Sequence, residues 1–295
     1  MAGDFKFYLR NRIDPKAADR WKKFKKGDSL SETTWDIAYS LGYQMPEEDS
    51  AAVAPAQHAT GHDPIIVLPR TAAAATAAAD GVPVEPPPLS YAQQRLWFLD
   101  QFEPGSPFYN VPAAVRLSGH LHLPALEQAV NEIVRRHEVL RTTFTSKNGV
   151  PVAVVLPAAD VAITLPVVDL RHLAPEQREP EARRLSAEEA RKPFDLATGP
   201  LLRGTLLRVP ASGSAAATGG SEDSEYIALI TMHHIVSDGW SVGVFIRELA
   251  ALYEVFSTGK APSPELAAVA AGLPALPVQY SDFAAWQRGW FDSAR

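Results

Sequence analysis

The chain has 295 residues, 46% hydrophobic and 21% charged, so it can fold around one sizeable core or two small ones. Its 28 Lys and Arg against 34 Asp and Glu give a net charge of −6, which argues against attraction of the whole chain to nucleic acid or to an anionic membrane surface. The lack of cysteine excludes disulfides, thiolate metal sites and a cysteine nucleophile. We expect neither a signal peptide nor a membrane span, and therefore a cytoplasmic protein.

Residues 1–49 differ from the rest of the chain in how their charges are arranged. Nine basic and three acidic side chains lie in residues 1–26, whereas residues 27–49 contain six acidic and no basic ones. A capping box opens a clear helical pattern over residues 29–41, and a weaker helical pattern covers residues 5–24. We therefore expect a small all-α module of two or three short helices.

The composition changes after this module. Residues 51–87 contain twelve alanines and six prolines and almost no aromatic residue, so they cannot bury a core, and we predict a linker over residues 50–87. The apolar run Pro64–Leu68 within it is open to three interpretations: an isolated strand, a short docking segment, or an adhesive patch of the linker.

From residue 88 onward the apolar spacing alternates between the helical and the extended type. Helices are predicted at 89–102, 124–136, 175–191 and 240–256, and strands at 111–117, 152–156, 163–168, 201–209 and 225–232. Elements that alternate in this way are typical of an α/β or α+β sandwich, in which helices pack against a mixed sheet.

Two histidines follow the most apolar of these strands. Successive side chains of a strand point to opposite faces, so His233 and His234 cannot both face one cleft; we expect one to be packed and the other to be presented. Asp238 then lies in the turn before the next helix. A buried carboxylate is costly unless it is paired, so this position predicts an arginine partner elsewhere in the chain.

Several kinds of chemistry are compatible with these residues. A pair of core histidines at a strand end is the structural interpretation. A metal site is a poor fit because neighbouring histidines on opposite faces make poor common ligands, and no GxSxG sequence supports a serine triad. The remaining interpretation is a histidine that acts on a bound nucleophile, as a general base or by orienting it.

Four segments together resemble the ordered motifs of the condensation domains of nonribosomal peptide synthetases, which catalyse peptide-bond formation in secondary metabolite biosynthesis and share a superfamily with chloramphenicol acetyltransferase. The segments are Leu89–Phe98, Arg136–Phe144, Met232–Ser241 and Tyr280–Trp286, and Pro193–Leu196 lies where the family has a further short motif. The resemblance covers residues 88–295. It implies a chloramphenicol-acetyltransferase-like lobe.

The resemblance also implies roles for individual residues. His234 would face the tunnel in which a donor thioester and an acceptor amine meet, and Gly239 would lie close to the reacting thioester. Asp238 would be structural, ion-paired to an arginine such as Arg136. His233 would act mainly through stability.

For other residues of the motifs we expect a structural role or leave two alternative roles open. Arg141 and Trp286 match positions that the family needs for integrity. For Arg95, Trp97 and His137, packing or surface pairing and a functional role remain equal alternatives. Asp238-Gly-Trp-Ser favours condensation over the related heterocyclisation and epimerisation subfamilies.

The resemblance implies partners instead of a bound cofactor. Donor and acceptor carrier proteins would bring the substrates on 4′-phosphopantetheine arms, and neither metal, nucleic acid nor membrane is implied. The motifs of the family's second lobe are missing before Arg295, so we expect the chain to be inactive alone.

A noncatalytic docking or scaffold module for the association of synthetase subunits is the alternative function. Residues 1–49 would dock on an upstream synthetase subunit, although a helix-turn-helix DNA binder, a leader-peptide-like domain and a merely solvated charged face are the other interpretations.

Overall fold

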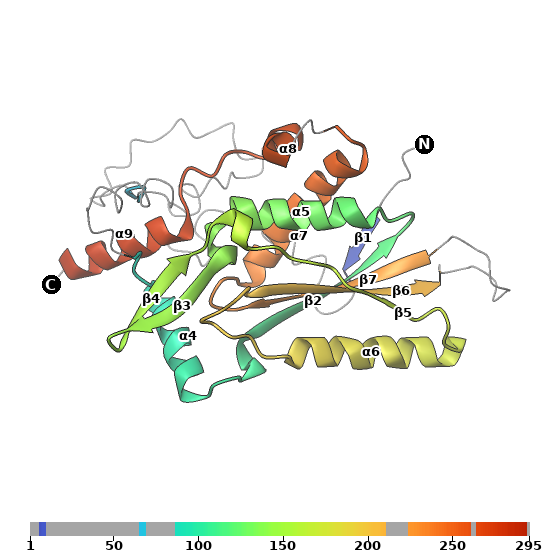
Figure 1. Cartoon of the computed structure of the whole chain (residues 1–295), viewed down its shortest axis with the longest axis horizontal. Coiled ribbons are helices and arrows are strands. Elements are labelled where there is room, and N and C mark those ends of the chain that lie inside the picture. Colours follow the sequence, from blue (N-terminus) through green and yellow to red (C-terminus); the bar gives the residue numbers. More distant parts are fainter. Residues whose placement is uncertain (1–5, 10–64, 69–85, 211–223, 261–263, 294–295) are drawn as a thin grey trace, which may run out of the picture.

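A five-stranded sheet with helices on both faces dominates the computed structural model, which describes residues 6–9, 65–68, 86–210, 224–260 and 264–293 (Figure 1). This confirms the predicted α/β lobe. Most of the predicted N-terminal module and linker lies outside the described residues. None of the helices in the described ranges is long and apolar enough to cross a membrane.

The sheet has the strand order β1-β2-β7-β6-β5. Its strands are β1 (Lys6–Leu9), β2 (Asn110–Ser118), β5 (Val167–Asp169), β6 (Leu202–Pro210) and β7 (Ser224–His233). β5 runs parallel to β6, and the other neighbours are antiparallel, so the sheet is mixed as predicted. The apolar strand β7 lies at the centre of the sheet, which explains why its side chains are buried on both faces.

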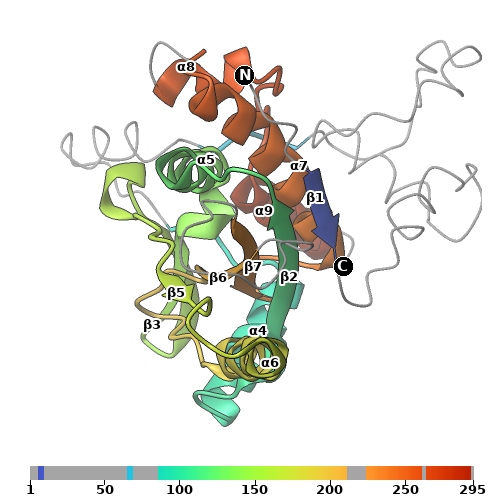
Figure 2. The ribbon, with the colours of Figure 1, turned by 90° about the vertical axis from the view of Figure 1, so that its right-hand side faces the viewer.

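Helices cover the two faces of the sheet unequally. α5 (Leu123–Arg136) and α7 (Gly239–Ser257) pack on one face over the main core, and α6 (Pro175–Arg191) covers the other (Figures 1 and 2). The bounds of these helices agree with the prediction within one residue. In α5 the buried side chains repeat every three or four residues, as in an amphipathic surface helix.

The remaining elements lie around this sandwich. The helices are α4 (Tyr91–Phe102), α8 (Pro264–Ala270) and α9 (Tyr280–Ser293), and the 3₁₀ turns are η3 (Pro107–Tyr109), η4 (Glu138–Arg141) and η5 (Ala158–Asp160). A separate hairpin joins β3 (Thr142–Lys147) to β4 (Val150–Val155).

The N-terminal residues 6–9 correct one prediction. We expected helical structure there, but they form β1, which pairs with β2 in an antiparallel register from Lys6 with Ser118 to Leu9 with Val115. β2 would otherwise be an edge strand with unpaired N–H and C=O groups, and two of the four residues are aromatic, a type that favours strands. The helical prediction was therefore wrong for these four residues.

Residues 65–68 correct another interpretation, because they do not form a strand. The backbone N–H of Leu68 donates a hydrogen bond of 2.8 Å to Oδ1 of Asp282, which is fully buried at the start of α9. This part of the linker is therefore docked on the lobe. α9 is in turn tied to the start of α4, because Arg288 donates to the carbonyl of Leu89.

Candidate active site

The two adjacent histidines at the end of β7 have opposite environments. His233 is 3% exposed, its Nδ1 accepts a hydrogen bond of 3.1 Å from the N–H of Ile235, and its ring packs edge-on against Phe194. Burial, and then the neighbouring His234, lower the pKa of His233 to about 4. His233 is therefore a neutral packed residue at pH 7, whereas His234 is exposed, as the alternation predicted.

Two hydrogen bonds fix His234 in place. Its backbone N–H donates to the carbonyl of Tyr109 at 2.8 Å, and its Nδ1 lies 2.6 Å from the carbonyl oxygen of Ser237. Because a carbonyl can only accept, Nδ1 carries the proton of the neutral ring. Nε2 is then the basic nitrogen, which can accept a proton or a hydrogen bond.

The turn after the histidines differs from the prediction. Asp238 is exposed, and its Oδ1 accepts hydrogen bonds from the N–H of Ser241 at 2.7 Å and from its hydroxyl at 2.6 Å. Asp238 is therefore the N-cap of α7, which satisfies one of the free N–H groups at the helix start. The predicted ion pair with Arg136 is wrong, because a cap exposed to solvent needs no cation.

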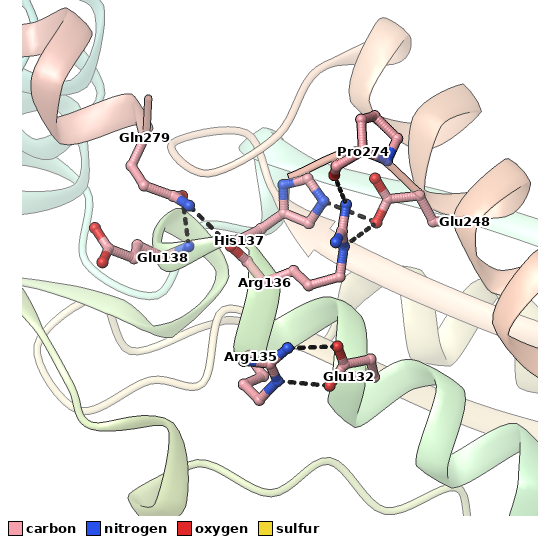
Figure 3. Close-up of polar contacts among 8 residues, drawn as sticks. All are labelled: Glu132, Arg135, Arg136, His137, Glu138, Glu248, Pro274 and Gln279. Carbon is pink, nitrogen blue, oxygen red and sulfur yellow. Dashed lines mark hydrogen bonds and ion pairs between the residues drawn. The ribbon is translucent and has the colours of Figure 1, made fainter. Parts of the chain in front are cut away.

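Arg136 is instead paired with a carboxylate farther along α7. Its Nε lies 3.3 Å from Oε2 of Glu248, and its side chain is only 7% exposed (Figure 3). A terminal nitrogen of Arg136 also donates to the carbonyl of Pro274 at 3.0 Å. The buried charge of Arg136 is thus paired, although with a different residue than expected.

His137 shares the same carboxylate. Its Nε2 lies 3.0 Å from Oε2 of Glu248 (Figure 3). Burial alone would raise the pKa of Glu248, but the hydrogen bonds and charges of His137 and Arg136 outweigh it and hold that pKa below its usual value. Glu248 is therefore ionised at neutral pH and joins α7 to the end of α5.

Gln279 connects the second and fourth sequence motifs. Its side-chain amide donates to the carbonyl of Arg136 at 2.9 Å, and its Oε1 accepts from the N–H of Glu138 at 3.0 Å (Figure 3). Its own N–H donates to Oδ2 of Asp282 at 2.7 Å. The motif that begins at Tyr280 thereby holds the backbone on either side of His137.

A cavity of about 310 Å³ lies between these groups. His234, Asp238 and Ser241 line it from the turn and the start of α7, and His137 and Gln279 line it from η4 and the segment before α9. Most of the other lining side chains are apolar, among them Leu96, Ile133, Val139, Val244, Phe245 and Leu276. Glu248 and Gln279 were missed from the sequence, although the position of Glu248 seven residues after Ser241 places both on one face of a helix.

The other predicted residues lie around the cavity and not in its wall. Arg141 is buried and contacts Glu138 at 3.4 Å and the carbonyl of Leu156, and Trp286 stacks on Trp290 within α9. Arg95 is exposed on α4, and Trp97 packs partly against the core. Of the three positions left open, only His137 lines the cavity.

Gly239 is the first residue of α7 and is exposed beside the turn. Beyond its chain neighbours and the backbone of α7, a Cβ placed on it would meet no atom of the described residues within 4 Å. The site is thus open to solvent at this point. In the described ranges no group of three or more His, Asp or Glu has the arrangement of a metal site.

A family model described as "Condensation domain" matches residues 85–295. The chain belongs to the condensation-domain family. Members of this family that act in peptide synthetases are acyltransferases that form peptide bonds. The resemblance seen in the four motifs is thereby confirmed.

Curated relatives of this condensation domain are large synthetases. It is 47% identical over 205 residues to a linear gramicidin synthase of Brevibacillus parabrevis, an alignment that covers 70% of this chain and 2% of that protein. It is 43% identical over 210 residues to phosphinothricin tripeptide synthetase PhsC of Streptomyces viridochromogenes, covering 71% of this chain and 17% of that protein. The chain thus spans a small part of the length of these relatives.

Solved structures are similar to the condensation domain as well. The X-domain from teicoplanin biosynthesis has 29% identity and a TM-score of 0.56, covering 72% of this chain and 40% of that chain. The same domain in its complex with OxyB has 27% identity and a TM-score of 0.59, covering 80% of this chain and 42% of that chain. These neighbours confirm the fold of the lobe.

Proposed function

We propose that this condensation domain forms an amide bond between two substrates that carrier proteins deliver on 4′-phosphopantetheine arms. The amine of an acceptor aminoacyl group attacks the thioester carbonyl of a donor aminoacyl or peptidyl group. The new C–N bond forms as the C–S bond breaks, the nitrogen loses one proton, and the donor's arm leaves as a thiol. The domain needs no cofactor of its own in this reaction; its partners are the two carrier proteins.

The state of His234 is the observation that carries this proposal. Its ring is held by Ser237 so that the basic Nε2 is available, and the residue lines a cavity large enough for a substrate group. Such a nitrogen accepts a hydrogen bond from the attacking amine, which orients the amine or removes its proton. His234 is the proposed catalytic residue.

The neighbouring residues receive supporting roles in the proposal. The missing side chain of Gly239 lets the thioester approach the open end of the cavity. Asp238 fixes the start of α7, and His233 anchors the strand end by packing. Arg141 and Trp286 act through the integrity of the fold.

A second candidate function is a noncatalytic module that recruits or joins synthetase subunits. The observation in its favour is the similarity to the teicoplanin X-domain, which is known in a complex with OxyB. In this candidate the cavity beside His234 would be unused and the outer surface of the lobe would carry the function.

The proposal extends to the N-terminal residues and to a second lobe. Residues 1–49, with their separated basic and acidic halves, would dock on an upstream synthetase subunit through complementary charge. A second condensation lobe would complete the tunnel for the two arms. This part rests on the family and on the charge pattern.

The test is condensation in trans. The 295-residue chain is incubated with donor and acceptor carrier proteins, with and without the second lobe of a related condensation domain, and amide product is measured by mass spectrometry. We expect product only with both lobes, and about 10²–10⁴-fold slower product formation with His234→Ala. Absence of product with folded, associated lobes would contradict catalysis and favour the scaffold function.

A further inference from the structure

The cavity extends well beyond the atoms that amide formation requires. Apart from the turn that bears His234, its walls come from the end of β7, α4, the end of α5, η4, the first turns of α7 and residues 276–280. Its volume of about 310 Å³ is at the lower end of the range of ligand pockets. This space admits a large aliphatic or aromatic side chain of a substrate.

Most polar groups in the wall are already paired with the protein. His137 is bonded to Glu248, and both ends of the Gln279 amide are bonded to backbone. Ser241 is bonded to Asp238, and the hydroxyl of Tyr280 lies 3.1 Å from that of Ser90. Among its described residues the wall contains no Lys or Arg, and its carboxylate, Asp238, lies on the exposed turn and not in the inner part of the cavity. A charged substrate group that passes beyond the exposed turn would lose its hydration without gaining a partner.

The apolar part of the wall is continuous with the face of α7. Val244 and Phe245 follow Ser241 by three and four residues, so they lie on the face of α7 that also carries Glu248. Ile133, Val139 and Leu276 line the same cavity from other elements. A substrate group that enters beside His234 therefore meets hydrocarbon.

We infer that this cavity selects an aminoacyl substrate by binding an uncharged, apolar side chain of about the size of leucine or phenylalanine. The inference rests on the proposed function, because the thioester of that substrate would lie at His234. The gain comes from moving hydrocarbon out of water into the space between α7 and residues 276–278. Charged and very small side chains are disfavoured.

The test uses hydrolysis-resistant thioether analogues of aminoacyl-pantetheine with glycyl, leucyl, phenylalanyl, aspartyl and lysyl groups. Their binding to the 295-residue chain is measured by calorimetry, each with a free α-amine and with an acetylated one to represent acceptor and donor. We expect the leucyl and phenylalanyl analogues to bind at least tenfold more tightly than the glycyl analogue, in one of the two series. The aspartyl and lysyl analogues should bind no better than the glycyl one.

Variants of Val244 locate the preference in the cavity. Val244→Phe fills the space and should reduce the leucyl-to-glycyl ratio to within twofold, whereas Val150→Phe on the exposed β3–β4 hairpin is the matched control and should leave it unchanged. Val244→Thr keeps the shape of the side chain but replaces a methyl group with a hydroxyl. It should also lower the leucyl-to-glycyl ratio, and it serves as the test if Val244→Phe does not fold.

The two failures are distinguishable. Equal affinity for all side chains, or a preference that both Val244 variants leave intact, would overturn the inference while the binding itself still supports the proposed function. Absence of binding by every analogue and by pantetheine itself, also with the second lobe of a related condensation domain present, would contradict the proposed function and the inference together.

Discussion

Two carboxylates, one at the N-cap of α7 and one within the helix, have opposite environments. This contrast explains how the site is built. Asp238 at the helix start is exposed and accepts hydrogen bonds from Ser241, whereas Glu248 in the middle of the helix is buried and accepts from Arg136 and His137. The arginine that sequence reasoning assigned to the first belongs to the second. A carboxylate needs a cationic partner where the fold removes it from water. Its position in a sequence motif does not decide this.

The largest effect should come from separating this buried pair. Glu248→Ala leaves the guanidinium of Arg136 buried without its carboxylate, and we expect a loss of about 3–5 kcal/mol in the free energy of unfolding, measured in urea. Arg136→Met combined with Glu248→Leu removes both charges and should recover most of the loss. A loss below about 1 kcal/mol for the single variant would show that the pair is not desolvated.

A third carboxylate tests the loss of a buried acceptor of backbone N–H groups. Asp282 is fully buried, and its contacts include hydrogen bonds from the backbone N–H groups of Leu68 and Gln279. Asp282→Ala should cost about 1–3 kcal/mol, because buried amide donors lose their acceptor. It should also expose residues 65–68 to limited proteolysis. Unchanged proteolysis of that segment would contradict its docking on α9.

His233 extends the comparison to pH. Its pKa of about 4 lies below the unfolded value of about 6.5, so below pH 6.5 the unfolded chain binds a proton that the native chain does not. The free energy of unfolding should therefore fall by about 1–2 kcal/mol from pH 6.5 to pH 5, where carboxylates are still ionised. His233→Asn should flatten this slope. An equal slope in the variant would place the titrating group elsewhere.

The smallest effect is expected at the exposed carboxylate. Asp238→Ala removes an N-cap and should cost about 0.5–2 kcal/mol, while Asp238→Ser, which also caps helices, should cost less. Arg136 should be unaffected, so Asp238→Ala combined with Glu248→Ala should show additive losses. If Asp238→Ala lowered the free energy of unfolding as much as Glu248→Ala does, the result would support the buried ion pair that was predicted from the sequence.

The spacing of apolar residues predicted an element wherever that element packs an apolar face against the core. The helix over residues 175–191 was predicted with both ends, and the apolar run of β7 marked the central strand. The strand predicted over residues 163–168 is shorter, because side chains of α5 bind the N–H groups of Ile163 and Leu165 before β5 begins. β3 was missed, since its sequence Thr-Thr-Phe-Thr-Ser-Lys has little apolar alternation.

The sequence predicted only those features of the site that depend on neighbouring residues of one element. Alternation along β7 was enough to separate His233 from His234. The contacts of Arg136 with Glu248 and with Gln279 join residues 112 and 143 positions apart, so they depend on how α5, α7 and the segment before α9 pack. No spacing rule of one element contains that information.

Single-turnover condensation is the decisive measurement for a catalytic His234. Carrier-bound donor and acceptor are mixed with the two associated lobes, and amide formation is followed in the wild type and in His234→Ala. We predict a rate about 10²–10⁴-fold lower in the variant, with its free energy of unfolding unchanged within about 0.5 kcal/mol. A variant that retains nearly the full rate would contradict a catalytic His234 and leave the histidine pair a purely architectural feature.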